Sequence, residues 1–334
     1  MTSRPAILIA RTVFPEVVER LRQHFEVDHN HTDTVLSPAE LAQRLQGKVG
    51  VMVTGSERID AALLAACPGL RIAANIAVGY NNFDVPAMTA AGVLATNTPD
   101  VLTETTADFG FALMMATARR VTESEHFLRA GLWNRWALDM FAGAEVHGST
   151  LGILGMGRIG QAIARRGALG FGMRVIYHNR SRLSAEQESP LNARYVDKTT
   201  LLKEADHLVL VLPYSATSHH SIGAADLALM KPTATLTNVA RGGIVDDAAL
   251  AAALRQRQLA AAALDVFEGE PRVHPELLTL PNVVLTPHIA SATVATRRAM
   301  AELAASNLIA ALTGATPPTP INPQVLQDGV LPRR

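Results

Sequence analysis

The stretch TLGILGMGRIGQAIARR, residues 150–166, constrains the fold of this chain more than any other. A short aliphatic run leads into GxGxxG, and helix-like sequence begins at once. Gly155 permits a tight turn, Gly157 lets the backbone approach a pyrophosphate, and Gly160 lets helix and strand pack closely. A diphosphate would then lie on the free N–H groups at the positive end of the helix, including those of Arg158 and Ile159. The pattern predicts a dinucleotide-binding turn.

The expected acidic residue for the adenosine ribose is absent about twenty residues later. The second aliphatic run ends in YHNRSR, residues 177–182, with Asn179 where a carboxylate would stand. A methyltransferase-type nucleotide fold, the main competitor, would also need an acid here. Asn179 does not repel a 2′-phosphate, Arg180 offers a planar fork of donors, and Ser181 and Arg182 follow. We therefore expect NADP(H) to be preferred, with NAD(H) as the alternative cofactor.

Short aliphatic runs alternate with amphipathic stretches along the whole chain, which predicts an α/β fold with parallel sheets. The runs that restart at Thr150 number six, so we expect a six-stranded doubly wound domain over residues 101–287. Four further runs precede residue 100, and a helix is expected near residues 291–314 after the last strand. The dinucleotide-binding domain is thus expected to be inserted into a discontinuous domain made of residues 1–100 and 288–334.

The segment from Thr103 to Trp133 reads as one long helix that is apolar on two sides. Such a helix is buried on both sides, either within one subunit or between two. We favour a homodimer interface. One face carries Ala107, Phe111, Met114, Ala118 and Val121, and the other carries Phe109, Leu113 and Ala116.

Composition excludes several classes of protein. Lys+Arg and Asp+Glu balance at 30 each, so nothing indicates a nucleic-acid partner or an anionic membrane surface. The one cysteine, Cys67, allows no intramolecular disulfide, and the first apolar run is too short for a signal or spanning segment. We expect a cytoplasmic protein. No histidines and acids stand at metal-ligand spacing, so we expect no metal.

Three reactive side chains follow three of the later strands. Arg241 lies in NVARGGIVD, Glu270 in LDVFEGEP and His288 in VVLTPHIASAT. The carboxyl ends of parallel strands share one edge of a sheet, which is where open α/β sheets bind ligands. Each residue alone has an ordinary structural interpretation, but together they indicate an active site beside the dinucleotide.

The chain resembles the D-isomer-specific 2-hydroxyacid dehydrogenases, and within them the NADPH-linked glyoxylate/hydroxypyruvate reductases, including 2-ketogluconate reductases. The resemblance rests on AVGYNNFDV, NTPDVLTETTADFGFALMMATARR, TLGILGMGRIGQAIA, MKPTATLTNVARGGIVD, ALDVFEGEP and NVVLTPHIASAT. It implies two Rossmann-like domains, the substrate domain being flavodoxin-like. It also implies reduction of small 2-keto acids to D-2-hydroxy acids, with glyoxylate, hydroxypyruvate and 2-ketogluconate as candidates.

The same resemblance implies the roles of the site residues. Arg241, Glu270 and His288 correspond to the catalytic Arg, Glu and His. The substrate carboxylate would lie on the N–H groups of Val78 and Gly79, and Trp136 would reach the substrate site of the neighbouring subunit. Further cofactor contacts are expected at Pro213, Val239, Ala240 and Asp265.

The chemistry of keto-acid reduction needs these residue types. Arg241 stays cationic, so it can orient the carboxylate and polarise the carbonyl. His288 can donate the proton, with a benefit of roughly 10²–10⁴-fold, and Glu270 would hold the imidazolium.

Two alternatives remain open from the sequence. One is another reaction on the same scaffold, such as D-lactate, phosphoglycerate or phosphite oxidation. The other is a non-catalytic corepressor that senses the dinucleotide, since such proteins can retain the Arg, Glu and His.

Overall fold

The computed structural model describes residues 4–332 and divides the chain into two compact units. The first comprises the residues up to Leu102 together with those from Thr293 onward, and the second is Thr103–Ala292. The chain therefore returns to the first unit after Ala292, whereas the sequence placed this crossing at 287/288. His288 consequently lies in the same unit as the glycine turn. Among the described residues, no helix is both long and apolar enough to cross a membrane.

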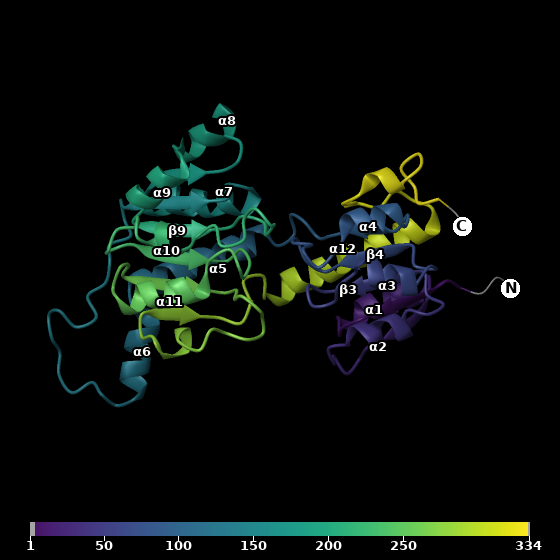
Figure 1. Ribbon diagram of the computed structural model, residues 1–334, viewed down its shortest axis with the longest axis horizontal. Coiled ribbons are helices and arrows are strands. Elements are labelled where there is room, and N and C mark those ends of the chain that lie inside the picture. Colours follow the sequence, from purple (N-terminus) through teal and green to yellow (C-terminus); the bar gives the residue numbers. More distant parts are fainter. Residues whose placement is uncertain (1–3, 333–334) are drawn as a thin grey trace. The chain divides into compact units, whose positions relative to one another are not determined.

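The first unit is built on a parallel five-stranded sheet (Figure 1). Its strand order, β2-β1-β3-β4-β5, is that of flavodoxin-like folds. The strands are β1 (Ala6–Ile9), β2 (Glu26–His29), β3 (Gly50–Val53), β4 (Ile72–Asn75) and β5 (Leu94–Thr96). The sequence analysis missed β2 because its residues, EVDH, are polar and only partly buried at the sheet edge.

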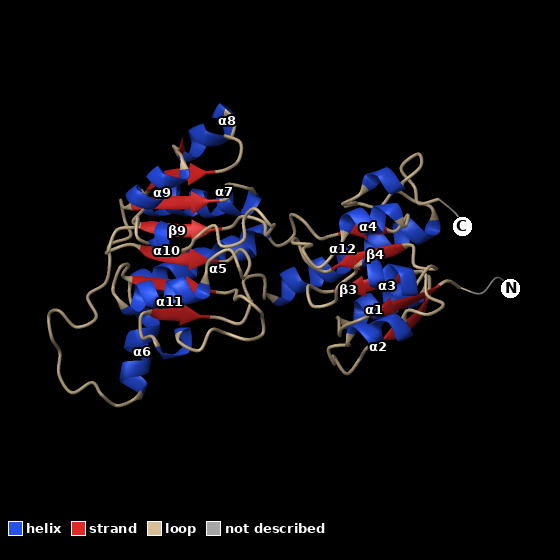
Figure 2. Cartoon of the chain, in the orientation of Figure 1, coloured by secondary structure: helices blue, strands red, loops and turns tan. Residues whose placement is uncertain are grey.

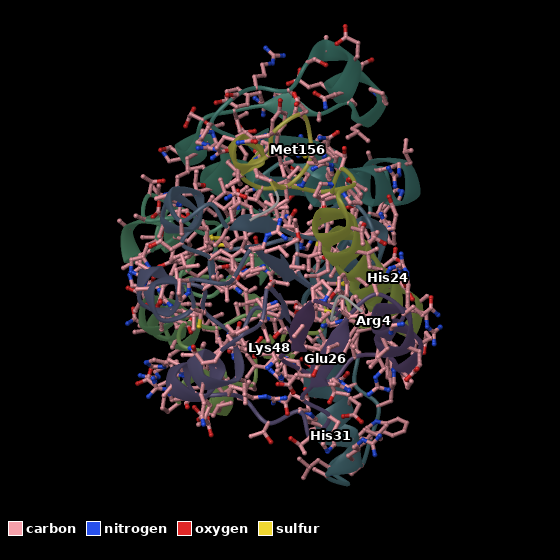
Figure 3. All side chains as sticks on the ribbon, turned by 90° about the vertical axis from the view of Figure 1, so that its right-hand side faces the viewer. Arg4, His24, Glu26, His31, Lys48 and Met156 are labelled. Atoms are coloured by element: carbon pink, nitrogen blue, oxygen red, sulfur yellow. The ribbon has the colours of Figure 1, made fainter. Side chains whose placement is uncertain are left out.

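Helices cover both faces of this sheet. One buried cluster joins the strands to α1 (Pro15–Arg22) and α12 (Val294–Thr313), and a second joins them to α2 (Pro38–Arg44), α3 (Ala61–Ala66) and α4 (Val85–Ala90). The helix expected near residues 291–314 is thus confirmed as α12. Cys67 is buried, and burial raises the pKa of its thiol. His24 and His31, labelled in Figure 3, are exposed.

The second unit carries a seven-stranded parallel sheet, visible as stacked arrows in Figure 2. The order β12-β11-β10-β9-β6-β7-β8 reverses direction between β6 and β9. The strands are β6 (Thr150–Leu154), β7 (Arg174–His178), β8 (Arg194–Tyr195), β9 (His207–Leu210), β10 (Thr235–Asn238), β11 (Ala261–Leu264) and β12 (Val283–Leu285). The prediction of six strands was wrong, because β8 has only two residues and carries no aliphatic run.

Side chains of successive strand residues alternate between two cores in this unit. Leu208 and Leu210 pack under one set of helices, whereas Val209 packs under the other. The first set is α9 (Lys198–Glu204), α10 (Ala224–Leu227) and α11 (Asp247–Arg255), and the second includes α5 (Thr103–Ala118) and α7 (Arg158–Arg165). A short helix, α8 (Ala185–Glu188), follows β7.

The single long helix expected from Thr103 to Trp133 is two helices. α5 ends at Ala118, and α6 (Val121–Arg129) begins after Arg120, whose left-handed φ of 53° breaks the helical path. α5 packs within its own unit on α7 and β10, so its apolar faces are buried inside the subunit. α6 has no buried residue.

Candidate active site

The glycine turn after β6 has the shape that a dinucleotide diphosphate requires. Gly155 has a φ of 101°, and a Cβ added there would lie 2.6 Å from the backbone nitrogen of Leu212, which follows β9. A Cβ on Gly160 would lie 2.4 Å from the carbonyl oxygen of Gly155, so both positions require glycine. A Cβ on Gly157 would meet nothing within 4 Å. The backbone at Gly157 is therefore open to approach, at the point where the sheet order reverses.

The first turn of α7 faces this opening. Gly157 is its N-cap, and the backbone N–H groups of Arg158 and Ile159 lie in this first turn. These amides fit a diphosphate at a helix N-terminus.

Asn179 closes the glycine turn from the neighbouring strand. Its side-chain oxygen accepts a hydrogen bond from the backbone N–H of Met156 at 2.6 Å, and Met156 is labelled in Figure 3. The Asn179 carbonyl oxygen accepts from the hydroxyl of Tyr195 at 3.0 Å. Asn179 thus joins the ends of β6, β7 and β8.

The two arginines that follow Asn179 differ in their surroundings. Arg180 is exposed and forms no ion pair with any described residue, and Ser181 beside it is exposed as well. Arg182 is exposed too, but it forms a bidentate ion pair with Glu188 at 2.9 and 2.7 Å. Sequence reasoning missed Glu188, whose polar position in α8 gives no sign that it binds the loop.

The Arg241 loop is shaped by its neighbours on both sides. The side-chain oxygen of Asn238, at the end of β10, accepts from the N–H of Ala240 at 3.0 Å, and its amide nitrogen donates to the Arg241 carbonyl at 3.2 Å. Nη1 of Arg241 donates to the carbonyl of Ala240 at 2.7 Å. Burial lowers the pKa of the Arg241 guanidinium, while the charge of Glu270 opposes that shift.

Glu270 and His288 form a hydrogen-bonded pair at the same sheet edge. Nδ1 of His288 lies 2.8 Å from Oε2 of Glu270, whose Oε1 accepts from the N–H of Phe267 at 2.9 Å. Burial works to raise the pKa of the Glu270 carboxyl, but the bond from His288, with the charges of His288 and Arg241, holds it below its ordinary value. With Nδ1 engaged by a carboxylate, Nε2 is the nitrogen left to face a reactant.

Asp265 holds the His288 loop in place. This fully buried carboxylate accepts hydrogen bonds from the hydroxyl of Thr286 at 2.7 Å and from the N–H groups of Ile289 and Ala290 at 2.8 Å each. Its carbonyl accepts from the N–H of His288, which has a left-handed φ of 54°. Asp265 is one of the residues expected to contact the cofactor, and its bonds within the chain support the backbone around His288.

The other expected cofactor contacts follow β9 and β10. Pro213 is exposed after β9, whereas Val239 and Ala240, after β10, are only 7% and 6% exposed.

In the first unit, the loop after β4 presents backbone N–H groups. The side-chain amide of Asn75 donates to the carbonyl of Gly79 at 3.0 Å, and that of Asn97 donates to the carbonyl of Val78 at 2.8 Å. The carbonyls of Val78 and Gly79 are thereby held in place. In the described part of the chain, the backbone N–H groups of Val78 and Gly79 donate to no other backbone or side-chain group. Such a loop is suited to binding an anion.

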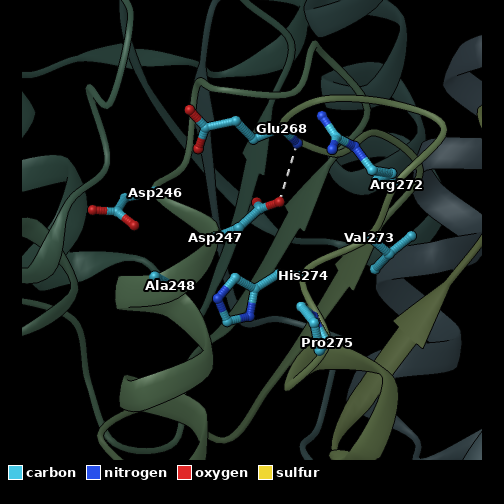
Figure 4. Close-up of a pocket in the computed structure, with 8 residues that line it drawn as sticks. All are labelled: Asp246, Asp247, Ala248, Glu268, Arg272, Val273, His274 and Pro275. Atoms are coloured by element: carbon cyan, nitrogen blue, oxygen red, sulfur yellow. Dashed lines mark hydrogen bonds between the residues drawn. The ribbon is translucent and has the colours of Figure 1, made fainter.

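A separate pocket of about 610 Å³ is lined by acidic and basic side chains and includes Glu268, two residues before Glu270 (Figure 4). Asp247, which is 5% exposed, accepts from the N–H of Glu268 at 3.0 Å, and burial raises the pKa of its carboxyl. Asp246, Arg272 and His274 also line the pocket. Arg241, Glu270 and His288 do not, so the pocket is distinct from the candidate active site.

His219, His220 and Glu268 lie close together next to this pocket. One possible ligand atom from each lies within 4.8 Å of the others. However, the two imidazoles are stacked 3.9 Å apart with only 22° between their planes. Their in-plane lone pairs therefore lie in two nearly parallel planes, which is a poor arrangement for binding one ion. Nε2 of His220 instead contacts Oε2 of Glu268 at 3.0 Å, as a hydrogen bond.

Comparison with known proteins identifies the family. Residues 111–290 match the model described as the D-isomer specific 2-hydroxyacid dehydrogenase, NAD binding domain. The chain is 48% identical over 327 residues to a glyoxylate reductase of Thermococcus onnurineus, covering 97% of each chain. This chain belongs to the D-isomer specific 2-hydroxyacid dehydrogenases. It is therefore an oxidoreductase whose second unit binds a nicotinamide dinucleotide, as the sequence predicted.

Two further relatives agree with this membership of the dehydrogenase family. The chain is 46% identical over 326 residues to glyoxylate/hydroxypyruvate reductase B of Klebsiella pneumoniae, covering 96% of this chain and 99% of the relative. It is also similar to the crystal structure of an NADPH-dependent glyoxylate/hydroxypyruvate reductase of Sinorhizobium meliloti in complex with NADP and malonate. That match has a TM-score of 0.86 and 36% identity and covers 99% of both chains. The two-unit α/β fold is thus the fold of the family's 2-hydroxyacid dehydrogenases.

Proposed function

We propose that this enzyme reduces small 2-keto acids to D-2-hydroxy acids, with glyoxylate and hydroxypyruvate as its best substrates and NADPH as its preferred cofactor. The observation that carries the proposal is the carboxylate-backed imidazole of His288, held by Glu270 at the sheet edge that also bears the glycine turn. The names of the relatives from Thermococcus onnurineus and Klebsiella pneumoniae support these two substrates. 2-Ketogluconate is a third candidate.

Each residue has a defined task in this reaction. Arg241 binds the substrate carboxylate and polarises the neighbouring carbonyl, helped by the N–H groups of Val78 and Gly79. His288 gives a proton from Nε2 to the carbonyl oxygen as it becomes a hydroxyl, and Glu270 stabilises the charged imidazole through Nδ1. Held by the amides of the glycine turn, the nicotinamide dinucleotide supplies the hydride chemistry.

The preference for NADPH rests on Arg180 and Ser181. Both are exposed beside the glycine turn, and no carboxylate stands at position 179 to repel a 2′-phosphate. A charge-assisted hydrogen bond contributes about 1.5–3 kcal/mol, so one or two such bonds favour NADPH by roughly ten- to a hundredfold or more.

A panel of kcat/KM values tests this function. Glyoxylate, hydroxypyruvate, 2-ketogluconate and pyruvate are compared, each with NADPH and with NADH. We expect glyoxylate or hydroxypyruvate with NADPH to give the highest value. A higher value with NADH refutes the cofactor preference, and the absence of turnover with every keto acid refutes the reductase function and favours the dinucleotide-sensing alternative.

A homodimer is part of the proposal. Large apolar side chains, each at least 50% exposed, follow one another along one stretch of the sequence: Val121, Leu128, Leu132, Trp133, Trp136 and Leu138. Contiguous exposed apolar surface of this kind marks a protein–protein contact. A cytoplasmic location also belongs to the proposal, because the single cysteine, Cys67, is buried and forms no intramolecular disulfide.

The role of Trp136 in the partner's site is tested with mixed dimers. His288→Ala and Trp136→Ala chains are co-expressed with different tags, and the heterodimer is purified. If Trp136 acts in trans, the protomer that keeps His288 receives an intact Trp136 from its partner, and the KM for hydroxypyruvate at that site returns to the wild-type value. A KM that stays at the value of the Trp136→Ala homodimer shows that Trp136 acts within its own subunit or not at all.

A further inference from the structure

A buried cluster anchors the far end of the loop between β7 and α8. The hydroxyl of Tyr177, a fully buried residue, donates to Oε1 of Glu188 at 2.6 Å and accepts from the N–H of Leu183 at 2.8 Å. Arg182 adds two parallel bonds to the same carboxylate. The Arg182 side chain is 65% exposed, whereas that of Glu188 is only 9% exposed. The carboxylate is thus satisfied on both oxygens.

The protonation states of this cluster agree with its geometry. The bonds from Arg182 and Tyr177 lower the pKa of the Glu188 carboxyl to about 2. Burial, together with the bond to Glu188, raises the pKa of the Tyr177 phenol to about 12. Glu188 is therefore an anion and Tyr177 a neutral donor at any working pH.

The near end of the same loop is anchored by Asn179 through its bonds to Met156 and Tyr195. Only Arg180 and Ser181 stand between the two anchors with exposed side chains that form no ion pair among residues 4–332. The loop therefore carries two guanidinium groups of which one is already neutralised.

We propose that Glu188 is a positioning residue for cofactor selectivity: it holds Arg182 away from the adenosine ribose and leaves Arg180, with Ser181, to bind the 2′-phosphate. This inference rests on the proposed preference for NADPH. The YHNRSR stretch has no acidic residue of its own to bind the ribose. Glu188 supplies a carboxylate from α8, and this carboxylate binds Arg182 of the loop and not the ribose. By neutralising Arg182, Glu188 changes the affinity of the loop for the 2′-phosphate, although Glu188 does not itself contact the cofactor.

Binding of two small adenosine ligands tests this assignment without any keto acid. The dissociation constants of 5′-AMP and of adenosine 2′,5′-bisphosphate are measured by calorimetry on the wild-type protein. The value for 5′-AMP divided by the value for the bisphosphate is a ratio that rises with stronger recognition of the 2′-phosphate. Arg180→Ala should reduce the ratio by roughly tenfold or more, since it removes a charge-assisted contact. Arg182→Ala should weaken both ligands equally and leave the ratio unchanged, because it loosens the loop without removing a phosphate contact. A ratio that falls in Arg182→Ala as far as in Arg180→Ala overturns the inference.

Glu188→Gln provides the complementary readout. The glutamine keeps the size of the side chain and an acceptor for Tyr177, but it releases the charge of Arg182. We expect the bisphosphate to bind more tightly relative to 5′-AMP, and adding Arg182→Ala should abolish that gain. An unchanged or lower ratio in Glu188→Gln shows that Glu188 does not restrain Arg182.

The inference and the proposed function fail in different ways. If the wild-type protein binds the bisphosphate no better than 5′-AMP, the preference for NADPH is wrong. The cluster is then tested by a double-mutant cycle of Arg182→Ala and Glu188→Gln on the free energy of unfolding. Additive effects contradict the coupling that the bidentate pair requires, and coupling supports it.

Discussion

Gly242 shows how closely two loops of the candidate active site approach each other. A Cβ added to Gly242 would lie 1.7 Å from the carbonyl oxygen of Phe267, so the Arg241 loop directly contacts the loop that leads to Glu270. No side chain can fit there without moving one of the two loops.

We therefore predict that Gly242→Ala displaces Arg241 or Glu270 and reduces kcat/KM by about a hundredfold, the size of effect expected from a displacement of about 1 Å. Gly223→Ala is the matched control, because its Cβ would meet only the His220 carbonyl, at 3.8 Å. Steady-state kinetics of both variants check this. Near-wild-type activity of Gly242→Ala shows that the loops do not depend on their close contact.

At the scale of residues, the sequence indicated candidate site residues that follow strands. It did not indicate the residues that hold the neighbouring loops in place by hydrogen bonds. Arg241, Glu270 and His288 could be proposed because each follows an aliphatic run, and the parallel sheet brings the ends of such runs to one edge. Asn238 and Glu188 were not found. Their effect depends on hydrogen bonds to loop atoms that only the folded chain brings near, such as the Arg241 carbonyl and the Tyr177 hydroxyl.

At the scale of elements, aliphatic runs predicted the long buried strands and missed those with few or polar residues. β8 has two residues and β2 is polar, yet each forms a strand because it pairs in parallel with the neighbouring strand of its sheet, β7 or β1. The break between α5 and α6 was missed because the left-handed conformation of Arg120 is not marked by a glycine or proline. Backbone geometry of this kind follows from packing and not from composition.

Asp265 links β11 to the His288 loop, and we predict that Asp265→Asn lowers kcat by at least tenfold while dinucleotide affinity changes little. In the variant, the amide nitrogen of asparagine would face one of the backbone N–H groups that now donate to the carboxylate. Two donors would then face each other in a buried place, which costs about 1–3 kcal/mol. Thr286→Val is the milder control, since it removes one of the three donors from the same carboxylate. Equal kcat in Asp265→Asn and the wild type contradicts this positioning role.

His207 makes β9 sensitive to acid. It is fully buried, with Nδ1 2.9 Å from the Thr235 hydroxyl and Nε2 3.1 Å from the Glu145 carbonyl. Burial lowers its pKa below the ordinary 6.5, although the bond to the Glu145 carbonyl opposes the shift. The unfolded chain therefore takes up a proton first as the pH falls, so the neutral imidazole contributes stability that is lost below pH 6.5.

We expect the free energy of unfolding to fall below pH 6.5 with a contribution of up to about 1.4 kcal/mol per pH unit from His207, until the folded protein is protonated too. Denaturant unfolding from pH 7.5 to 5 measures this. His207→Gln should show a shallower pH dependence than the wild type, whereas His24→Gln, at an exposed site, should not. Identical slopes for the wild type and His207→Gln exclude His207 as the source.

At the scale of the whole molecule, one unit supplies the glycine turn and all three catalytic candidates. The chain returns to the first unit only after Ala292, so His288 is fixed by the same fold that fixes Arg241 and Glu270. The aliphatic pattern alone placed the crossing two residues beyond the end of β12. That pattern gives no sign of the bonds from Ile289 and Ala290 to Asp265, which tie this stretch to β11.

The proposed reaction depends on His288 as the proton donor, and the variant His288→Ala tests this role. The variant is assayed with NADPH and glyoxylate beside the wild type, while the dissociation constant of NADPH is measured by fluorescence. We predict that kcat falls by roughly 10²–10⁴-fold and that NADPH binds as in the wild type. A variant that binds NADPH normally and keeps wild-type turnover would show that His288 is not the proton donor.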